Sequence, residues 1–207
     1  MKFKNIIFDW SGVIKDALNA HVWVVNEMME RLGKKKLSFN ELKENWEQPY
    51  LNFWRKYCPE LTLAEEQKIY YEVIGSKDCP KSDSCLGVID FIKKLNIKKV
   101  RMSVVSSDPT ERLLQEIKGF GLENIFDEVI TNAHDKSEGV NELIKKYDFN
   151  PEETVFIGDS NHEVEVGKEA GIKTIAVTWG FCTEEKLKST DPDYLVHNIK
   201  ELEEILL

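Results

Sequence analysis

The stretch Lys4-Asn5-Ile6-Ile7-Phe8-Asp9-Trp10-Ser11-Gly12-Val13 indicates the fold of this chain. Its apolar run, residues 6–8, is typical of a strand that is buried on both faces of a parallel sheet. Asp9 follows where such a strand gives way to a loop, and open parallel sheets bind ligands at that edge. An isolated Asp after a strand more often forms a turn, so this stretch alone assigns Asp9 no chemistry.

Composition and charge restrict the class of protein. The 207 residues are 42% hydrophobic and 31% charged, as in an ordinary globular protein. The net charge of -9 argues against a nucleic acid or an anionic membrane as the general partner. No apolar run approaches the roughly 20 residues that span a bilayer, and the N-terminus lacks a signal-peptide apolar region. We therefore expect a cytoplasmic protein, monomeric or weakly dimeric, that acts on a small molecule.

The four cysteines are too few and too scattered to form a disulfide framework in a chain of this length. Cys79 and Cys85 are close in sequence, but no second pair of Cys or His residues completes a zinc site. We assign the cysteines no part in the chemistry.

Residues 15–85 read as helical throughout. Apolar residues four apart, such as Val24, Met28 and Leu32, predict a helix over 20–32. Capping boxes beginning at Ser38 and Thr62 predict two further helix starts, and residues 50–58 read as another helix. The block is rich in Trp, Tyr and Phe, which favours a small aromatic core over a set of substrate contacts. We predict that residues 15–85 form an inserted helical cap.

Strands and helices alternate after residue 86, which predicts a doubly wound parallel α/β sheet with helices on both faces. Asp108-Pro109-Thr110-Glu111 predicts a helix start with Asp108 as N-cap. The predicted core comprises residues 1–14 and 86–207. Its later strands are expected at 100–105, 129–130, 154–157, 174–177 and 193–196, and its helices at 86–95, from 108, at 138–147, 164–170 and 199–206.

Polar residues collect at the C-terminal ends of these strands. Besides Asp9, they include Ser106-Ser107-Asp108, His134-Asp135-Lys136 and Gly158-Asp159-Ser160-Asn161-His162-Glu163. Carboxylates suit Mg²⁺, whereas an ammonium group, a hydroxyl and helix-start N–H groups suit a phosphate. Asp9 is therefore a candidate nucleophile toward phosphorus, with Mg²⁺ held by Asp9 and Asp159.

The chain resembles the haloacid dehalogenase-like hydrolase superfamily, whose four motifs occur in order. The first is Asp9-x-Ser11 after an apolar strand, the second ends a strand at Ser106, the third is Lys136, and the fourth is Gly158-Asp159-x-x-x-Glu163. The C-terminal part, residues 176–180 and 191–195, looks like the phosphoglycolate-phosphatase-like branch. In that branch a helical cap lies between the first two motifs, where the aromatic block stands.

The resemblance implies a role for each motif residue. Asp9 corresponds to the nucleophile and a Mg²⁺ ligand, and the backbone carbonyl of Ser11 to a second ligand. Asp159 corresponds to a direct ligand, whereas Glu163 would bind the metal through water or orient Lys136. Ser106 and Lys136, with Ser107 beside them, would hold the phosphate.

Ser11 departs from the pattern of the family's phosphatases, which carry a general acid/base Asp at this position. A hydroxyl is not ionised at neutral pH, and losing general acid–base help typically costs about 10²–10⁴ in rate. Three functions remain open: a slow magnesium-dependent phosphatase, a phosphonoacetaldehyde hydrolase using a cap lysine such as Lys43 or Lys56, and a non-enzymatic binding protein. We favour the phosphatase because every other catalytic position is filled.

Overall fold

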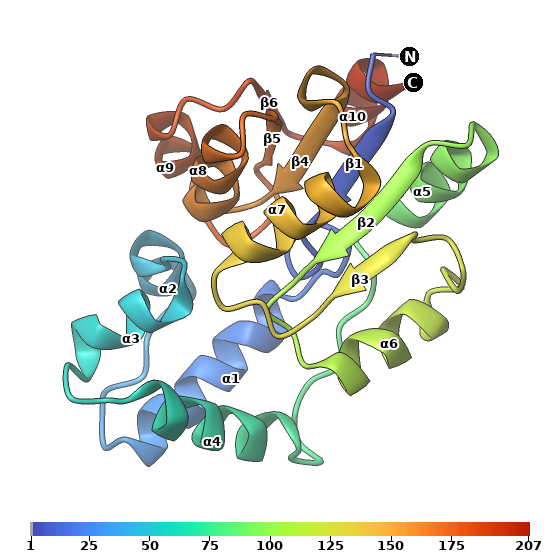
Figure 1. Cartoon of the computed structure of the whole chain (residues 1–207). Helices are drawn as coiled ribbons and strands as arrows, with labels where there is room; N and C mark the ends of the chain where they lie inside the picture. Colours follow the sequence, from blue (N-terminus) through green and yellow to red (C-terminus); the bar gives the residue numbers. More distant parts are fainter. Residues whose placement is uncertain (1) are drawn as a thin grey trace.

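The computed structural model describes residues 2–207 as a parallel sheet with helices on both faces and a group of helices at one edge (Figure 1). Within these residues the sheet has six strands in the order β3-β2-β1-β4-β5-β6, and all neighbouring pairs are parallel. The strands are β1 (Asn5–Phe8), β2 (Arg101–Val105), β3 (Glu128–Ile130), β4 (Thr154–Gly158), β5 (Lys173–Val177) and β6 (Tyr194–Val196). The predicted doubly wound α/β core is confirmed.

Alternate residues of β1 pack into two different cores. Ile6 and Phe8 face α5 (Val88–Ile97), α6 (Thr110–Gly119) and α10 (Ile199–Leu206). Ile7 faces the opposite way, toward α7 (Lys136–Tyr147) and α8 (Asn161–Glu169). Because β1 is central and buried on both faces, its sequence is a continuous apolar run rather than an alternating one.

The strand register brings the polar strand ends together. Phe8 pairs with Val104 on one side and with Ile157 on the other. The residues that follow β1, β2 and β4 therefore emerge side by side at one edge of the sheet. The first residue after β1 is Asp9 and the first after β4 is Asp159.

Four helices between β1 and α5 gather beyond this edge (Figure 1). They are α1 (Leu18–Arg31), α2 (Phe39–Asn45), α3 (Tyr50–Tyr57) and α4 (Leu63–Ile74). Both predicted capping boxes are present, from Ser38 to Glu41 and from Thr62 to Glu65. All four helices lie inside residues 15–85, and the division of the chain there into cap and core stays a prediction.

The helical group shares a core with the sheet side of the molecule. Met28, Phe53 and Trp54 are buried in one cluster with Ala176 and Phe181. Leu187 of α9 (Glu184–Ser189), a helix that our sequence reading missed, completes this cluster. Trp46, Phe53 and Trp54 of the block are thus core residues, and several other rings of the block pack against them while partly buried.

Helix starts account for the main differences from the predicted elements. α7 begins at Lys136 rather than at 138, because the Asp135 side chain caps it. α8 begins at Asn161 rather than at 164, because Ser160 and Glu163 form a capping box. A short 3-10 helix, η1 (Pro151–Glu153), precedes β4. The motif residues Lys136 and Glu163 are therefore held in helix first turns.

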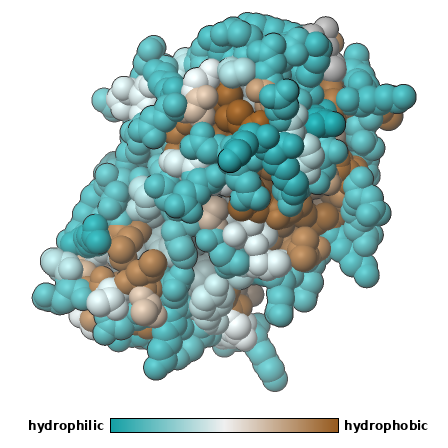
Figure 2. Space-filling view, in the orientation of Figure 1, coloured by the Kyte–Doolittle hydropathy of each residue, from teal (hydrophilic) through white to brown (hydrophobic). Residues whose placement is uncertain are grey.

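The surface in Figure 2 is mainly hydrophilic, with apolar residues exposed in smaller areas between polar ones. No helix within residues 2–207 combines the length and the apolar character needed to cross a bilayer.

Candidate active site

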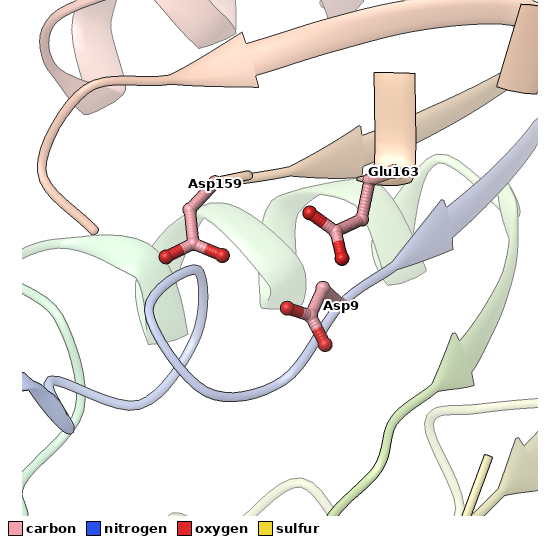
Figure 3. Close-up of side chains that lie close together, drawn as sticks. All are labelled: Asp9, Asp159 and Glu163. Atoms are coloured by element: carbon pink, nitrogen blue, oxygen red, sulfur yellow. The ribbon is translucent and has the colours of Figure 1, made fainter. Parts of the chain in front are cut away.

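Three buried carboxylates meet at the edge of the sheet where β1 and β4 end. Asp9, Asp159 and Glu163 each offer an oxygen, and these oxygens all lie within 4.8 Å of one another (Figure 3). Asp9 and Asp159 follow their strands directly, and Glu163 lies in the first turn of α8. The structure thus brings together three of the residues that the sequence predicted to meet.

Lys136 is the cation of this cluster. Its Nζ lies 2.9 Å from Oδ1 of Asp9 and 2.6 Å from Oε1 of Glu163, and the lysine is 2% exposed. Three ionised carboxylates and one ammonium group leave two negative charges uncompensated. Buried charge of this kind is unfavourable unless it is paired or coordinates a metal. The cluster therefore suits a divalent cation.

Burial and the neighbouring charges shift the pKa values of the three carboxyl groups in different directions. Burial raises the pKa of Asp9 to about 7 against the opposing effect of Lys136, and the charge of Glu163 adds to the rise. Burial, with the charges of Asp9 and Glu163, also raises the pKa of Asp159 well above its usual value. For Glu163, burial alone would raise the pKa, but the charges of Lys136 and His162 and the hydrogen bonds from Lys136 and Ser160 together lower it to about 2.

Oxygen ligands of this type fit Mg²⁺, which is bound by carboxylates at close range. Asp159 is fixed for such a role, because its Oδ2 accepts a hydrogen bond of 2.6 Å from the backbone N–H of Phe181. Its carboxylate packs against Gly12 and Gly180, where a Cβ atom would overlap it. Gly12 also has a φ of +92°, which glycine adopts most easily. The backbone around Asp159 is therefore built to admit the carboxylate.

Glu163 uses both of its oxygens inside the protein. Oε1 accepts a hydrogen bond from Lys136, and Oε2 accepts from the backbone N–H of Ser160 at 2.8 Å and from its hydroxyl at 2.6 Å. The same carboxylate thus caps α8 and positions Lys136. Of the two roles left open for Glu163 by the sequence, the observed contacts support orientation of Lys136.

Ser11 contacts a second carboxylate, Asp108. The Ser11 hydroxyl donates to Oδ2 of Asp108 at 2.7 Å, and the Ser106 hydroxyl donates to the same oxygen at 2.9 Å. Lys15 lies 3.7 Å from Oδ1 of Asp108 and 2.8 Å from Glu116. Although burial opposes it, Lys15 and the two hydroxyls lower the pKa of Asp108.

The prediction that Asp108 caps α6 is wrong. The N-cap is Pro109 and no side chain caps this helix. The Asp108 side chain is instead occupied by the hydroxyls of Ser11 and Ser106 and by Lys15. Because the Asp108 carboxylate accepts hydrogen bonds from these hydroxyls, it does not cap α6.

A cavity of about 100 Å³ extends from the carboxylates toward the four helices. At the sheet end its lining includes Asp9, Ser11, Ser107, Lys136 and Asp159. At the helical end it is lined by apolar and aromatic side chains and by a few polar groups. This second set comprises His21, Val24, Met28, Trp46, Tyr50, Trp54, Glu66, Gln67, Tyr70, Arg112, His134 and Phe181, among others.

The four helices α1–α4, called the helical insertion from here on, also form hydrogen bonds with the loop that leads to Lys136. The Tyr50 hydroxyl of α3 lies 2.6 Å from Nδ1 of His134, and the Gln67 amide of α4 lies 2.7 Å from its Nε2. Tyr71 donates to Asn132 at 3.3 Å. His134 is only two residues from Lys136, so the insertion and the candidate active site are directly joined.

The sequence reading did not identify Lys15 or Glu66 as site residues. Lys15 is 3% exposed and Glu66 is 3% exposed, and both line the cavity. Lys15 directly follows the apolar pair Val13-Ile14, and this was the one local indication that its side chain is buried. Glu66 lies in the acidic first turn of a capped helix, where a glutamate is ordinarily solvent-exposed. Nothing in the local sequence therefore indicated that Glu66 would be buried.

Comparison with known proteins places these observations in a family. A family model described as haloacid dehalogenase-like hydrolase matches residues 6–177. Pyrophosphatase PpaX of Halalkalibacterium halodurans is 27% identical over 125 residues, which cover 58% of this chain and 58% of that protein. The phosphoglycolate phosphatase of Synechococcus elongatus is 23% identical over 202 residues, covering 95% of this chain and 94% of that protein.

Solved structures confirm the fold. A predicted phosphatase from Clostridium acetobutylicum superimposes with a TM-score of 0.86 at 19% identity, covering 100% of this chain and 99% of that one. A predicted phosphoglycolate phosphatase from Haemophilus somnus gives a TM-score of 0.82 at 20% identity, with the same coverage. At these identities the likeness concerns the architecture alone.

Proposed function

The chain belongs to the haloacid dehalogenase-like hydrolase family, and we propose that it is a magnesium-dependent phosphohydrolase acting on a small phosphorylated metabolite through Asp9. The observation that carries this proposal is the buried cluster of Asp9, Asp159 and Glu163 around Lys136, which holds three carboxyl groups and one ammonium group. The phosphatase names of the relatives support it.

In the proposed first step, a carboxylate oxygen of Asp9 attacks phosphorus and the bond to the leaving oxygen breaks. This gives an acyl phosphate on Asp9 and an alkoxide leaving group, which takes up a proton and departs as the alcohol. In the second step water attacks the phosphorus, inorganic phosphate leaves and the carboxylate returns. Splitting one displacement into two is the usual benefit of a covalent nucleophile.

The other residues have supporting roles in this proposal. Lys136 neutralises the phosphate oxygens, and Ser107 contacts them from the end of β2. Ser106 would join them only by giving up its hydrogen bond to Asp108. Mg²⁺ would be held by Asp9, Asp159 and the Ser11 carbonyl, and when bound it would neutralise charge between the nucleophile and the substrate. Glu163 would contribute by orienting Lys136.

Because residue 11 is Ser, we propose that phosphate esters are hydrolysed slowly. Its hydroxyl cannot serve as an ordinary general base, and it already donates to Asp108. Substrates whose leaving group needs little protonation should therefore react best.

The cavity lends no support to phosphonoacetaldehyde hydrolysis, which would need a lysine of the helical insertion at the site. Lys56 instead pairs with Glu47 at 2.7 Å and is 41% exposed at its side chain. Lys43 stands in the last turn of α2. Within residues 2–207, neither of these lysines lines the cavity.

The nucleophile can be tested with Asp9→Asn. With Mg²⁺, wild-type protein should release phosphate from para-nitrophenyl phosphate, and the variant should lose about 10⁴-fold or more of this activity, because an amide is a poor nucleophile. Asp90→Asn, an exposed replacement on α5, is the matched control and should keep the activity. Turnover retained in Asp9→Asn would refute the assignment, whereas ligand binding without any turnover in the wild type would favour a binding protein.

A further inference from the structure

The helical end of the cavity holds a carboxylate among aromatic rings. Glu66 of α4 lines the cavity together with Trp46, Trp54, Tyr50 and Tyr70. Its negative charge adds to the effect of burial in raising the pKa of Tyr50, and contributes in the same way at Tyr70. Glu66 therefore lies close to both tyrosines.

Glu66 has no cation to balance it. It is 3% exposed, and no Lys, Arg or His within residues 2–207 forms an ion pair with it. The lysines and the arginine that line the cavity are already paired: Lys15 with Glu116, Lys136 with Asp9 and Glu163, and Arg112 with Glu116. His21 is kept neutral, because burial lowers its pKa to about 4. A positive charge for Glu66 must come from outside the chain.

Two ring nitrogens at this end are among the buried polar atoms that lack partners within the described structure. They are Nε2 of His21 and Nε1 of Trp46, and both are buried. The two rings pack edge to face, with centroids 4.3 Å apart, and both line the cavity. Trp46 is 4% exposed, so water reaches its N–H poorly. Buried polar groups normally have partners, so a ligand or a water in the cavity finds these two nitrogens free to bond.

Aromatic faces and a carboxylate are the usual means of binding an ammonium group. The faces of Trp and Tyr attract a cation through their negative charge distribution, and a desolvated carboxylate adds a direct ion pair. At about 100 Å³ the cavity suits a short molecule, since a cavity of about 150 Å³ holds benzene. The phosphate end of such a molecule would meet Lys136 and Asp9.

We propose that the substrate is a phosphate ester of a short amino alcohol, whose ammonium group is bound by Glu66 within the aromatic rings of the helical insertion. This inference rests on the proposed phosphohydrolase function and specifies its substrate class. It assigns opposite charges of the substrate to the two ends of the cavity, with the phosphate at the sheet edge and the ammonium group at α4.

The test compares two esters of the same shape. Phosphocholine carries a trimethylammonium group where 3,3-dimethylbutyl phosphate carries a neutral tert-butyl group. With Mg²⁺, wild-type kcat/KM should favour phosphocholine by at least about ten-fold. Glu66→Gln should bring the ratio of the two kcat/KM values close to one. Glu72→Gln, an exposed change on the same helix, should keep the wild-type ratio.

Calorimetric titration of both esters separates this inference from the proposed function. Tighter binding of phosphocholine by the wild type, lost in Glu66→Gln, supports the ammonium site even when no ester is hydrolysed; that result would refute only the phosphohydrolase. Equal treatment of the two esters by the wild type, in binding and in turnover, overturns the inference. A preference that survives in Glu66→Gln overturns it as well.

Discussion

The two ends of the cavity treat buried charge in opposite ways. At the sheet edge, Lys136 lies within ion-pair distance of both Asp9 and Glu163. At the helical end, Glu66 is buried with no cationic side chain paired to it in the described chain. The first arrangement fixes its groups before any ligand arrives, whereas the second leaves a charge for a ligand to satisfy. The sheet edge therefore pairs two of its buried carboxylates with a lysine of the chain, and the helical end pairs none.

Removing Lys136 should have the largest effect on stability. Lys136→Met leaves Asp9 and Glu163 buried without their cation, and loss of one partner from such a group typically costs about 3–5 kcal/mol. The free energy of unfolding, measured with urea without Mg²⁺, should fall by this amount. Lys145→Met, an exposed change on α7, is the control. Equal losses for both variants would show that the buried pairs contribute nothing, and the contrast between the two ends would disappear.

Removing the charge of Glu66 should instead raise the free energy of unfolding, and the size of this gain should depend on pH. Burial raises the pKa of Glu66 from 4.5 to about 7, with Trp54 opposing, so the folded protein favours the protonated form. The unfavourable charge is absent below about pH 4.5, develops as pH rises toward 7, and is complete above it. Glu66→Gln should therefore be more stable than the wild type at pH 8, by up to about 3 kcal/mol, and nearly equal at pH 4.5.

Urea unfolding at the two pH values measures this difference, with Glu72→Gln as the control. A glutamine variant that is less stable at pH 8 would show that Glu66 is satisfied inside the protein. The recognition role of the helical end would then lose its physical basis.

Restoring a carboxylate at residue 11 should have the smallest effect. Ser11→Asp supplies the missing acid/base group, yet it places that group beside Asp108, whose Oδ2 lies 2.7 Å from the present hydroxyl. Two carboxylates at this distance cannot both ionise easily. We expect about a ten-fold rise in kcat for para-nitrophenyl phosphate, and a larger rise when Asp108→Asn accompanies it. No rise in either variant would mean that another group already transfers the proton.

The sequence predicted the sheet end far better than the helical end. Asp9, Asp159 and Lys136 each follow a strand or begin a helix, and the parallel topology brings such positions to one edge whatever the details of packing. Their meeting, and that of Glu163, is confirmed, while their catalytic roles stay predictions. Glu163 lies just before the predicted helix 164–170, and the capping box from Ser160 places it in the first turn of α8 instead.

The helical end could not be predicted in the same way. Glu66 faces the cavity because α1, α3 and α4 pack at particular angles, and no local pattern encodes that. Asp108 was misread for a related reason: a helix cap is a local preference of about 1 kcal/mol, and contacts with Ser11 and Lys15, distant in sequence, overrode it.

His134 has a consequence for how a substrate reaches the site. The Tyr50 hydroxyl and the Gln67 amide, from two different helices, each lie within hydrogen-bond distance of one nitrogen of its imidazole, two residues before Lys136. A movement of α3 and α4 away from the sheet would break both contacts, which lie two residues before Lys136. The imidazole of His134 thus links the position of the helices to that of the segment that begins with Lys136.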